Sequence, residues 1–426
     1  MKIRKMLAFA TAAVICAGAI AGCGGAKDQN AGDGSSKDSG SKGGGSEILL
    51  WSSATGPDGE RIQKTINAYN ETGPEYKVKF VSMQADTFNT KLTTAGRSGK
   101  GVPDLALVAS EALPTYQTQE MLESWDEMIA DTELKKENYV ESAWEVGSLD
   151  GQQYGIPATM GSWVMFYNKD LMEKYAPGAL DDGYVTYEEI EAAGEAAKAD
   201  GIYSYANTWS LQNYSNLYLQ MGGEWLDADG KISINNEASA GVVEELKKLN
   251  DLGYMVPNGE DANKMFMNQK LIFLPEGTWM LSNMEAIKDF AWGETFTPQW
   301  DAANVVQCSG VDQFAVFKTG EERPDAKKQG MVKFLEWLQG NQLEWVKSGA
   351  NPSSLAMLEN EEYLAMPQSF LLTTEEGRAA ININAAEGLT YVFNEYDARA
   401  WDMITGKADI VQTFEEIQKI VDEKMK

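Results

Sequence analysis

The chain has 426 residues, of which 64 are acidic and 36 are basic, so its formal net charge is −28, and it contains no histidine. This charge argues against nucleic acid as a partner, because nucleic-acid binding depends on Lys and Arg side chains that neutralise phosphates. The missing histidine excludes Ser-His-Asp and Cys-His catalytic sites, as well as zinc sites that use histidine.

Residues 1–23 have the pattern of an export signal. Lys2, Arg4 and Lys5 are basic, and residues 6–20 form an uncharged apolar run. The run is shorter than the ~20 residues that a membrane-spanning helix needs, and it fits the apolar part of a signal peptide. Because Ala-Gly-Cys23 follows, the segment resembles a bacterial lipoprotein signal. We expect residues 1–22 to be removed and Cys23 to carry lipid; an ordinary signal peptide with a chance Cys is the alternative.

Residues 23–46 are predicted to be the lipidated Cys and a flexible linker. Residues 24–46 include eight Gly and five Ser, a composition that cannot bury enough apolar surface to fold. The expected product is a globular body that a lipid anchor holds at the extracytoplasmic face of the cell membrane. The mature chain of about 404 residues is too long for one compact core, so two domains are expected. Cys308 is then the one cysteine of the body, and no internal disulfide is expected.

The body begins with alternating apolar runs and helical patterns. In order, these predict a buried strand at 47–52, a turn-rich loop at 53–59, a helix around Ile62, Ile66 and Tyr69, a strand at 77–81, a helix at 87–96 that Asp86 caps, and a strand at 103–109. This alternation is typical of a parallel, doubly wound sheet. In such sheets ligands bind beyond the carboxyl ends of the strands, here residues 52–55 and 109–111.

The segment 170–306 is predicted to be largely helical, with helices at 188–199, 238–252 and 261–268. A strand is expected at 313–317. Helical spacing then predicts a helix at 325–338, with Met331, Phe334, Leu335 and Leu338 on one face, and a C-terminal helix marked by Phe414, Ile417 and Val421. Residues 227–231 resemble part of a calcium loop but lack ligand positions, so an Asp-Gly turn is predicted and no metal or cofactor is expected.

Several segments together resemble one known family. They are Ile48-Leu-Leu-Trp-Ser52 with the Gly-Pro loop after it, Pro103-Asp-Leu-Ala-Leu, Tyr154-Gly-Ile-Pro before Phe166-Tyr-Asn-Lys-Asp170, the segment 225–231, and Glu276-Gly-Thr-Trp279. In this order and spacing, they resemble the extracellular solute-binding proteins of bacterial ABC importers, in the carbohydrate-binding group that includes maltose-binding protein. The resemblance covers nearly all of residues 47–426.

The resemblance implies an α/β fold of two lobes, each a doubly wound sheet flanked by helices, with the ligand cleft between them. Crossing strands would lie near 157–162, 307–312 and 348–353. The N-terminal lobe would comprise 47–157 plus 311–348, and the C-terminal lobe 158–310 plus 349–426. The implied ligand is a carbohydrate, the implied partners are the permease subunits of the importer, which are separate chains, and we expect a monomer.

A sugar site needs aromatic faces for the C–H groups of the ring and polar groups for its hydroxyls. The resemblance places a stacking Trp at Trp279, an acidic ligand at Glu111, and a binding residue at Asn394, next to Phe393. Strand ends, crossings and loops add further candidates: Ser53, Thr55, Asp86, Trp163, Trp209, Glu276 and Asp312. The competing interpretation of each is core packing, turn chemistry or a solvated surface, and Trp51 is predicted to be a core residue.

Three functions are considered. The first is capture of a neutral sugar or oligosaccharide by closure of two lobes around it. The second is binding of a glycerol phosphodiester, which needs a cationic cleft and is disfavoured by a mature charge of about −31. The third is a surface glycoside hydrolase that uses two carboxylates, for example Glu111 and Glu276, since such enzymes need no histidine. We predict the first, and no enzyme activity.

Overall fold

The computed structural model of the protein describes residues 47–301 and 303–426. The predicted signal peptide, Cys23 and the linker lie outside these residues. Within the described ranges, no helix is both long and apolar enough to cross a membrane. In the same residues, no group of three or more Cys, Asp or Glu side chains could hold a metal ion.

The first three strands form a parallel sheet, as predicted. β1 (Glu47–Ser52) lies between β2 (Lys77–Ser82) and β3 (Leu105–Ala109). The helices α1 (Gly56–Glu71) and α2 (Ala85–Ser98) connect these strands. The strands pair in the order β2-β1-β3, which is the doubly wound arrangement that the alternating pattern predicts.

Two helix starts differ from the prediction. α1 begins at Gly56 inside the predicted loop, because Pro57 stands in the first turn, where its missing N–H leaves no hydrogen bond unmade. α2 begins at Ala85, so Asp86 lies within the first turn and does not cap the helix. The predicted cap at Asp86 is therefore wrong; a negative charge in that turn still favours the helix dipole.

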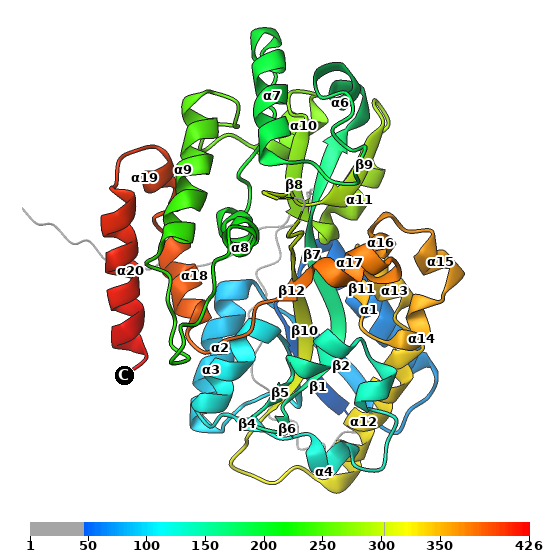
Figure 1. Ribbon diagram of the computed structural model, residues 1–426. Coiled ribbons are helices and arrows are strands. Elements are labelled where there is room, and N and C mark those ends of the chain that lie inside the picture. Colours follow the sequence, from blue (N-terminus) through cyan, green and yellow to red (C-terminus); the bar gives the residue numbers. More distant parts are fainter. Residues whose placement is uncertain (1–46, 302) are drawn as a thin grey trace, which may run out of the picture. The chain divides into compact units, whose positions relative to one another are not determined.

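Two long antiparallel strands run side by side through the described body (Figure 1). β7 (Gly155–Asn168) pairs with β10 (Gln307–Phe317) from Ala315↔Gly155 to Ser309↔Ser162, with a register irregularity between Asp312 and Gln313. β10 also pairs with β3, and the sheet order is β11-β7-β10-β3-β1-β2. β10 thus begins upstream of the strand predicted at 313–317.

β7 continues past β10 and pairs there with two further strands. These are β8 (Phe273–Gly277) and β9 (Trp292–Phe296), both antiparallel to β7. Both lie in the segment that was predicted to be largely helical. All five residues of β8 are buried, so this strand shows no alternation of apolar and polar residues that could reveal it.

Short strands complete the sheets: β4 (Leu122–Glu123), β5 (Ser148–Leu149), β6 (Gln152–Gln153), β11 (Asn351–Pro352) and β12 (Ile381–Ile383). The remaining helices are α3 (Leu113–Thr118), α4 (Asp126–Ile129), α5 (Glu141–Glu145), α6 (Lys169–Tyr175), α7 (Tyr187–Ala197), α8 (Ser210–Gln220), α9 (Glu237–Asp251), α10 (Ala262–Met267), α11 (Leu281–Glu285), α12 (Asp325–Gln339), α13 (Leu343–Val346), α14 (Leu355–Leu358), α15 (Glu361–Leu364), α16 (Phe370–Thr373), α17 (Glu375–Ala380), α18 (Leu389–Asp397), α19 (Ala400–Ile404) and α20 (Ile410–Lys424). The helices predicted at 188–199, 238–252, 261–268 and 325–338 are confirmed as α7, α9, α10 and α12.

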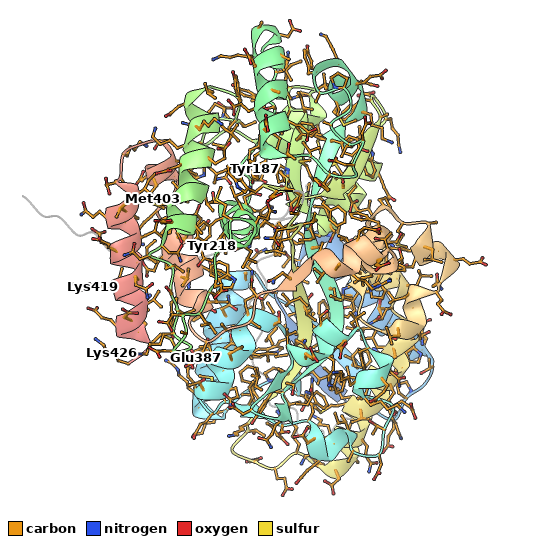
Figure 2. The ribbon with its side chains drawn as sticks, viewed as in Figure 1. Tyr187, Tyr218, Glu387, Met403, Lys419 and Lys426 are labelled. Atoms are coloured by element: carbon orange, nitrogen blue, oxygen red, sulfur yellow. The ribbon has the colours of Figure 1, made fainter. Side chains whose placement is uncertain are left out.

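Buried apolar side chains form two main cores. The first core joins β1, β3 and the ends of β7 and β10 to α1 and α12, and it includes the predicted face of α12. The second core lies among α7, α8, α9, α18 and α20 and includes Tyr187, Tyr218 and Met403, which Figure 2 labels. A small cluster includes Met160 and Val311, which are paired across β7 and β10. The residue boundaries given above for the two lobes stay a prediction.

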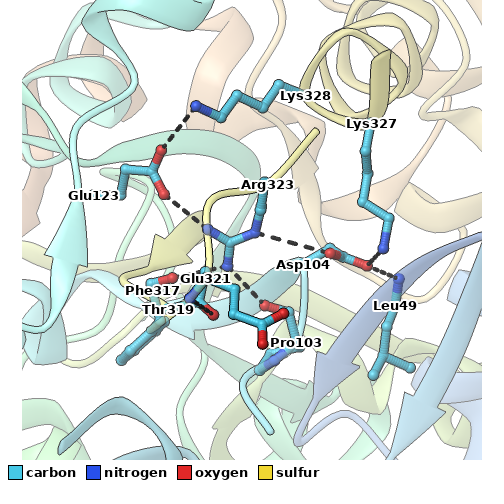
Figure 3. Close-up of polar contacts among 10 residues, drawn as sticks. All are labelled: Leu49, Pro103, Asp104, Glu123, Phe317, Thr319, Glu321, Arg323, Lys327 and Lys328. Atoms are coloured by element: carbon cyan, nitrogen blue, oxygen red, sulfur yellow. Dashed lines mark hydrogen bonds and ion pairs between the residues drawn. The ribbon is translucent and has the colours of Figure 1, made fainter. Parts of the chain in front are cut away.

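A buried guanidinium ties the first core together (Figure 3). Arg323 is 7% exposed. It donates to Glu123 Oε2 at 2.7 Å and to the carbonyl oxygens of Phe317 at 2.8 Å and Pro103 at 3.2 Å. Its Nε lies 3.8 Å from Asp104 Oδ1. Arg323 therefore satisfies backbone acceptors from two strand ends as well as pairing with carboxylates.

Asp104 extends this network to other elements. Its Oδ2 accepts from the backbone N–H of Leu49 in β1 and from Lys327 Nζ in α12, both at 2.8 Å. Lys328 Nζ lies 3.7 Å from Glu123 Oε1. Through Asp104, the network connects β1 of the parallel sheet to α12.

We expect Arg323→Lys to lower the free energy of unfolding by about 1–3 kcal/mol, because an ammonium cannot replace the planar fork and leaves buried carbonyls unpaired. Urea unfolding measures this change. Arg61→Lys is the matched control, since Arg61 forms an ion pair with Glu344 that is more exposed to solvent than the pairs of Arg323. Equal effects of the two substitutions would contradict the role of the fork.

Candidate functional site

A cavity of about 140 Å³, here called the central cavity, lies beside the paired segments 159–163 of β7 and 310–312 of β10. Its walls come from both strands, from the loop after β3, from the turn after β8, and from residues 345–350. The lining residues are Asp58, Ala109, Glu111, Thr159, Gly161, Trp163, Thr278, Trp279, Gly310, Val311, Asp312, Trp345, Ser348 and Ala350. The central cavity thus brings together four of the predicted residues, Glu111, Trp163, Trp279 and Asp312.

Two of these four residues lie directly after the end of a strand. Glu111 lies in a 3₁₀ turn (Ser110–Ala112) directly after β3, and Trp279 lies in a 3₁₀ turn (Thr278–Met280) directly after β8. Trp163 and Asp312 lie within β7 and β10. Loops after the carboxyl ends of strands are where ligands bind in open α/β sheets.

Tryptophan rings meet edge to face at one side of the central cavity. The rings of Trp163 and Trp279 have centroids 5.4 Å apart at 87°, and those of Trp209 and Trp279 have centroids 5.6 Å apart at 88°. The buried Nε1 of Trp163 has no hydrogen-bond partner among the described residues. The cluster therefore offers aromatic surface together with a free N–H donor.

Three carboxylates line the same cavity, with no Lys or Arg among its lining residues. Burial raises the pKa of Asp312 to about 7, with smaller contributions from the charges of Asp58 and Glu111, while hydrogen bonding to Thr159 opposes the rise. Burial also raises the pKa values of Glu111 and Asp58. Such groups accept hydrogen bonds from hydroxyl groups and repel anions.

Sequence reasoning missed several cavity residues. Asp58 was assigned to a loop, although it lies in the first turn of α1, just beyond the carboxyl end of β1. Trp345 comes from a segment without a motif, and Ser348 begins the predicted crossing at 348–353 but was not named as a site residue. Next to them, Gly349 has a φ of +108°, and a Cβ there would collide with the carbonyl oxygen of Thr278. The turn that holds Trp279 therefore packs directly on the backbone at 349.

A smaller cavity of about 50 Å³ adjoins the central cavity and shares Glu111, Trp163 and Gly310 with it. Phe393 and Cys308 also line it. Burial raises the pKa of the Cys308 thiol to about 12, so this cysteine is not a thiolate nucleophile at neutral pH. Phe393 reaches this cavity, whereas the predicted neighbour Asn394 is exposed on α18.

A third cavity, here called the side pocket, has a volume of about 330 Å³. It is lined by Ala206, Asn207, Thr208, Trp209, Val256, Pro257, Asn258, Gly259, Glu260, Ala262, Asn263, Glu276 and Trp401. Two predicted residues, Trp209 and Glu276, line this pocket and not the central cavity. The ring contact between Trp209 and Trp279 lies between the two spaces.

Glu276 is buried and fully hydrogen-bonded. Its Oε2 accepts from Trp209 Nε1 at 2.6 Å and from the N–H of Gly277 at 3.2 Å, and its Oε1 accepts from Asn263 Nδ2 at 3.0 Å. Burial raises the pKa of Glu276, and these donors oppose the rise. The carboxylate therefore holds the ring of Trp209 in place.

Four predicted residues line none of these three cavities. Ser53, Thr55, Asp86 and Asn394 are all exposed. Trp51 is partly buried and packs against the first core, as predicted.

A larger groove, of about 750 Å³, lies between α4 and α12. Its lining contains charges of both signs, no aromatic side chain and none of the predicted residues. It lacks the stacking surface of the other cavities.

Residues 53–344 match a family model described as bacterial extracellular solute-binding protein. An arabinooligosaccharide-binding protein of Halalkalibacterium halodurans is 24% identical, over 51% of this chain and 49% of that protein. The match thus spans about half the length of that relative. A galactooligosaccharide-binding protein of Bacillus subtilis is 24% identical over 97% of this chain and 96% of its own length.

Solved structures share the fold. An ABC substrate-binding protein of Listeria monocytogenes in complex with cycloalternan has a TM-score of 0.75 at 18% identity, over 89% of this chain and 98% of that chain. UgpB of Mycobacterium tuberculosis in complex with glycerophosphocholine also has a TM-score of 0.75, at 17% identity, over 89% and 99%. The predicted two-lobed α/β fold is confirmed by this likeness.

We expect Asp312→Asn to raise the melting temperature at pH 8 and to change it little at pH 4. The pKa of Asp312 rises from an ordinary 3.8 to about 7 on folding, so the carboxyl favours the folded state at low pH and loses this contribution as pH rises through 7. Thermal melts at both pH values measure the difference. The exposed Asp182→Asn is the control, and an equal gain at both pH values would contradict the assignment.

Proposed function

The chain belongs to the bacterial extracellular solute-binding proteins, and on that premise we propose that it captures a neutral sugar or oligosaccharide and delivers it to the permease of an ABC importer. The observation that carries this proposal is the central cavity, in which tryptophan rings and carboxylates face one space without a basic side chain. Ring faces suit the C–H groups of a sugar, and carboxylates suit its hydroxyls.

We propose that capture works by closure of two lobes, 47–157 plus 311–348 and 158–310 plus 349–426. The cavity takes Glu111 and Asp312 from the first lobe and Trp163 and Trp279 from the second. A ligand that contacts both sets favours the closed arrangement, since it binds that state better than the open one. The crossing segments near 157–162, 307–312 and 348–353 act as the hinge.

The names of the relatives support a carbohydrate ligand, because they refer to arabino- and galacto-oligosaccharides. A glycerol phosphodiester is the alternative, in view of the likeness to UgpB. Three carboxylates without a cation in the central cavity disfavour a phosphate there. We therefore place the neutral sugar first.

Hydrolysis of the sugar is not part of the proposal. Glu111 lines the central cavity, whereas Glu276 lines the side pocket, with both of its oxygens already hydrogen-bonded. A two-carboxylate hydrolase needs a free acid and a free carboxylate on either side of one glycosidic bond. The pair Glu111 and Glu276 does not meet this requirement.

We further propose that the protein is a monomeric lipoprotein at the extracytoplasmic face of the cell membrane. The support is the sequence of residues 1–23, with its basic start, apolar run and Cys23. A single acyl chain binds membranes only marginally, so the anchor on Cys23 carries two chains or more.

The first test is isothermal titration calorimetry of the purified mature protein with arabinose, galactose, glucose and their oligosaccharides. We expect saturable binding of at least one sugar, and a loss of about tenfold or more in affinity in Trp279→Ala, because the stacking face is removed. Trp300→Ala is the matched control, since Trp300 is 44% exposed and lies outside the three cavities described above. Binding of glycerophosphocholine with no sugar binding would overturn the ligand class.

The anchor is tested separately with Cys23→Ser in the full chain. We expect the wild type to incorporate a radiolabelled or alkyne-tagged palmitate in cells and to sediment with membranes, and the variant to do neither. Cys308→Ser controls for labelling at the other mature cysteine. Labelling of Cys23→Ser at the wild-type level would disprove the anchor.

A further inference from the structure

Three carboxyl groups from separate segments of the chain line the central cavity. Asp58 lies in the first turn of α1, Glu111 in the turn after β3, and Asp312 within β10. Like charges repel one another strongly in a small, shielded space such as this one, of about 140 Å³. Ionisation of all three groups at once is therefore unfavourable, and one of them tends to keep its proton.

Asp312 has acidic neighbours across the cavity and no basic one. Its Cα is paired with Ala109 of β3 and with Thr159 of β7, so strands flank it on both sides. Lys347, the basic residue of the segment 345–350, does not line the cavity and lies 3.2 Å from Glu362. The titratable groups that face Asp312 are therefore Asp58 from α1 and Glu111 from the turn after β3, while β7, the turn after β8 and the segment 345–350 add only uncharged side chains to the lining.

Two polar groups of the cavity are ready to bind a ligand. The Oγ of Ser348, whose side chain is 3% exposed, and the buried Nε1 of Trp163 have no hydrogen-bond partner among the described residues. A sugar hydroxyl both donates and accepts, and a ring or glycosidic oxygen only accepts, so a sugar site needs donors as well as carboxylate acceptors. A protonated carboxyl has an O–H donor that an ionised one lacks. Protonation of one carboxyl thus gives this cavity a further donor.

Asp312 is poised to gain or lose its proton near neutral pH. Burial raises its pKa to about 7, and the charges of Asp58 and Glu111 add to the rise, while hydrogen bonding to Thr159 opposes it. A ligand that fills the cavity and is enclosed there buries this carboxyl further, which disfavours its charged form. The ligand-bound protein therefore holds the proton more firmly than the free protein does.

We propose that Asp312 binds the sugar as a neutral carboxylic acid, which donates a hydrogen bond to an acceptor oxygen of the ligand, and that capture is therefore coupled to uptake of a proton from the solvent. This inference rests on the proposed function and adds to it a dependence on acidity. Asp58 and Glu111 remain acceptors for hydroxyl groups of the ligand. Because the bound state prefers the protonated carboxyl, affinity is constant at low pH and falls as the pH rises above neutrality.

The test is isothermal titration calorimetry of the mature protein between about pH 5.5 and pH 8.5, with arabinose, galactose, glucose and their oligosaccharides as probes. At pH 7.5 each titration is repeated in two buffers that differ in ionisation enthalpy, so that the protons taken up on binding are counted. Asp312→Asn introduces an amide that stays uncharged and keeps an N–H donor. Asp182→Asn is the matched control, because Asp182 is exposed and does not line the cavity.

For any sugar that binds, we expect the wild type and Asp182→Asn to bind about fivefold or more weakly at pH 8.5 than at pH 6. Both should take up about half a proton at pH 7.5, since a shift of one pKa unit changes affinity up to about tenfold. In Asp312→Asn the pH dependence and the proton uptake should both be largely lost.

Affinity that does not change with pH, or release of protons on binding, would overturn the inference and leave the proposed function standing. Both outcomes are measured on the wild type, so they do not depend on how well a variant folds. Proton uptake that persists in Asp312→Asn would also overturn the role of Asp312. A wild type that binds no sugar at any pH would overturn both the inference and the proposed function.

Discussion

The antiparallel pairing of β7 with β10 is the constraint on which the rest of the structure depends. Each strand contributes side chains to the first core and to the wall of the central cavity. β7 continues past β10 as the partner of β8 and β9, and its Met165 packs in the second core. A slip of one residue would turn every side chain to the opposite face. The register irregularity lies between Asp312, which lines the cavity, and Gln313, which is fully buried.

Three carboxylates and no basic side chain line the central cavity. Asp58, Glu111 and Asp312 share a small space, and burial raises the pKa values of all three. A polyol supplies hydroxyl donors to such acceptors without adding charge, whereas a phosphate adds charge of the same sign. The carboxylate of Glu276, in the side pocket, already has donors within the protein, since Trp209 Nε1 and Asn263 Nδ2 both donate to it. Glu276 therefore positions the ring of Trp209.

The sequence predicted those parts of the site that follow strand ends or a family motif. Glu111, Trp163, Trp279 and Asp312 meet in one cavity, and the parallel start of the sheet is as expected. Asp58, Thr159 and Ser348 were not predicted, because they reach the cavity through packing of segments far apart in the chain. β8 was missed because a fully buried strand shows no alternation, and β9 lies in the same segment, which was predicted to be largely helical. Ser53 and Thr55 follow a strand end but line none of the three cavities, since a strand end indicates a region and not the direction of a side chain. Asp86 and Asn394, which lie on helices, do not line them either.

Gly349 has a consequence for how the binding properties of this chain can change. Its backbone rests against the carbonyl oxygen of Thr278 with no room for a Cβ, and its φ of +108° suits glycine alone. Other residues are therefore not tolerated at position 349. The backbone contact also fixes the distance between the segment at 349 and the turn that holds Trp279. Asn258 and Glu260, by contrast, are exposed at the side pocket, and substitutions there leave that contact untouched. The scaffold thus separates a part that evolution or an engineer must keep from a part that either can vary.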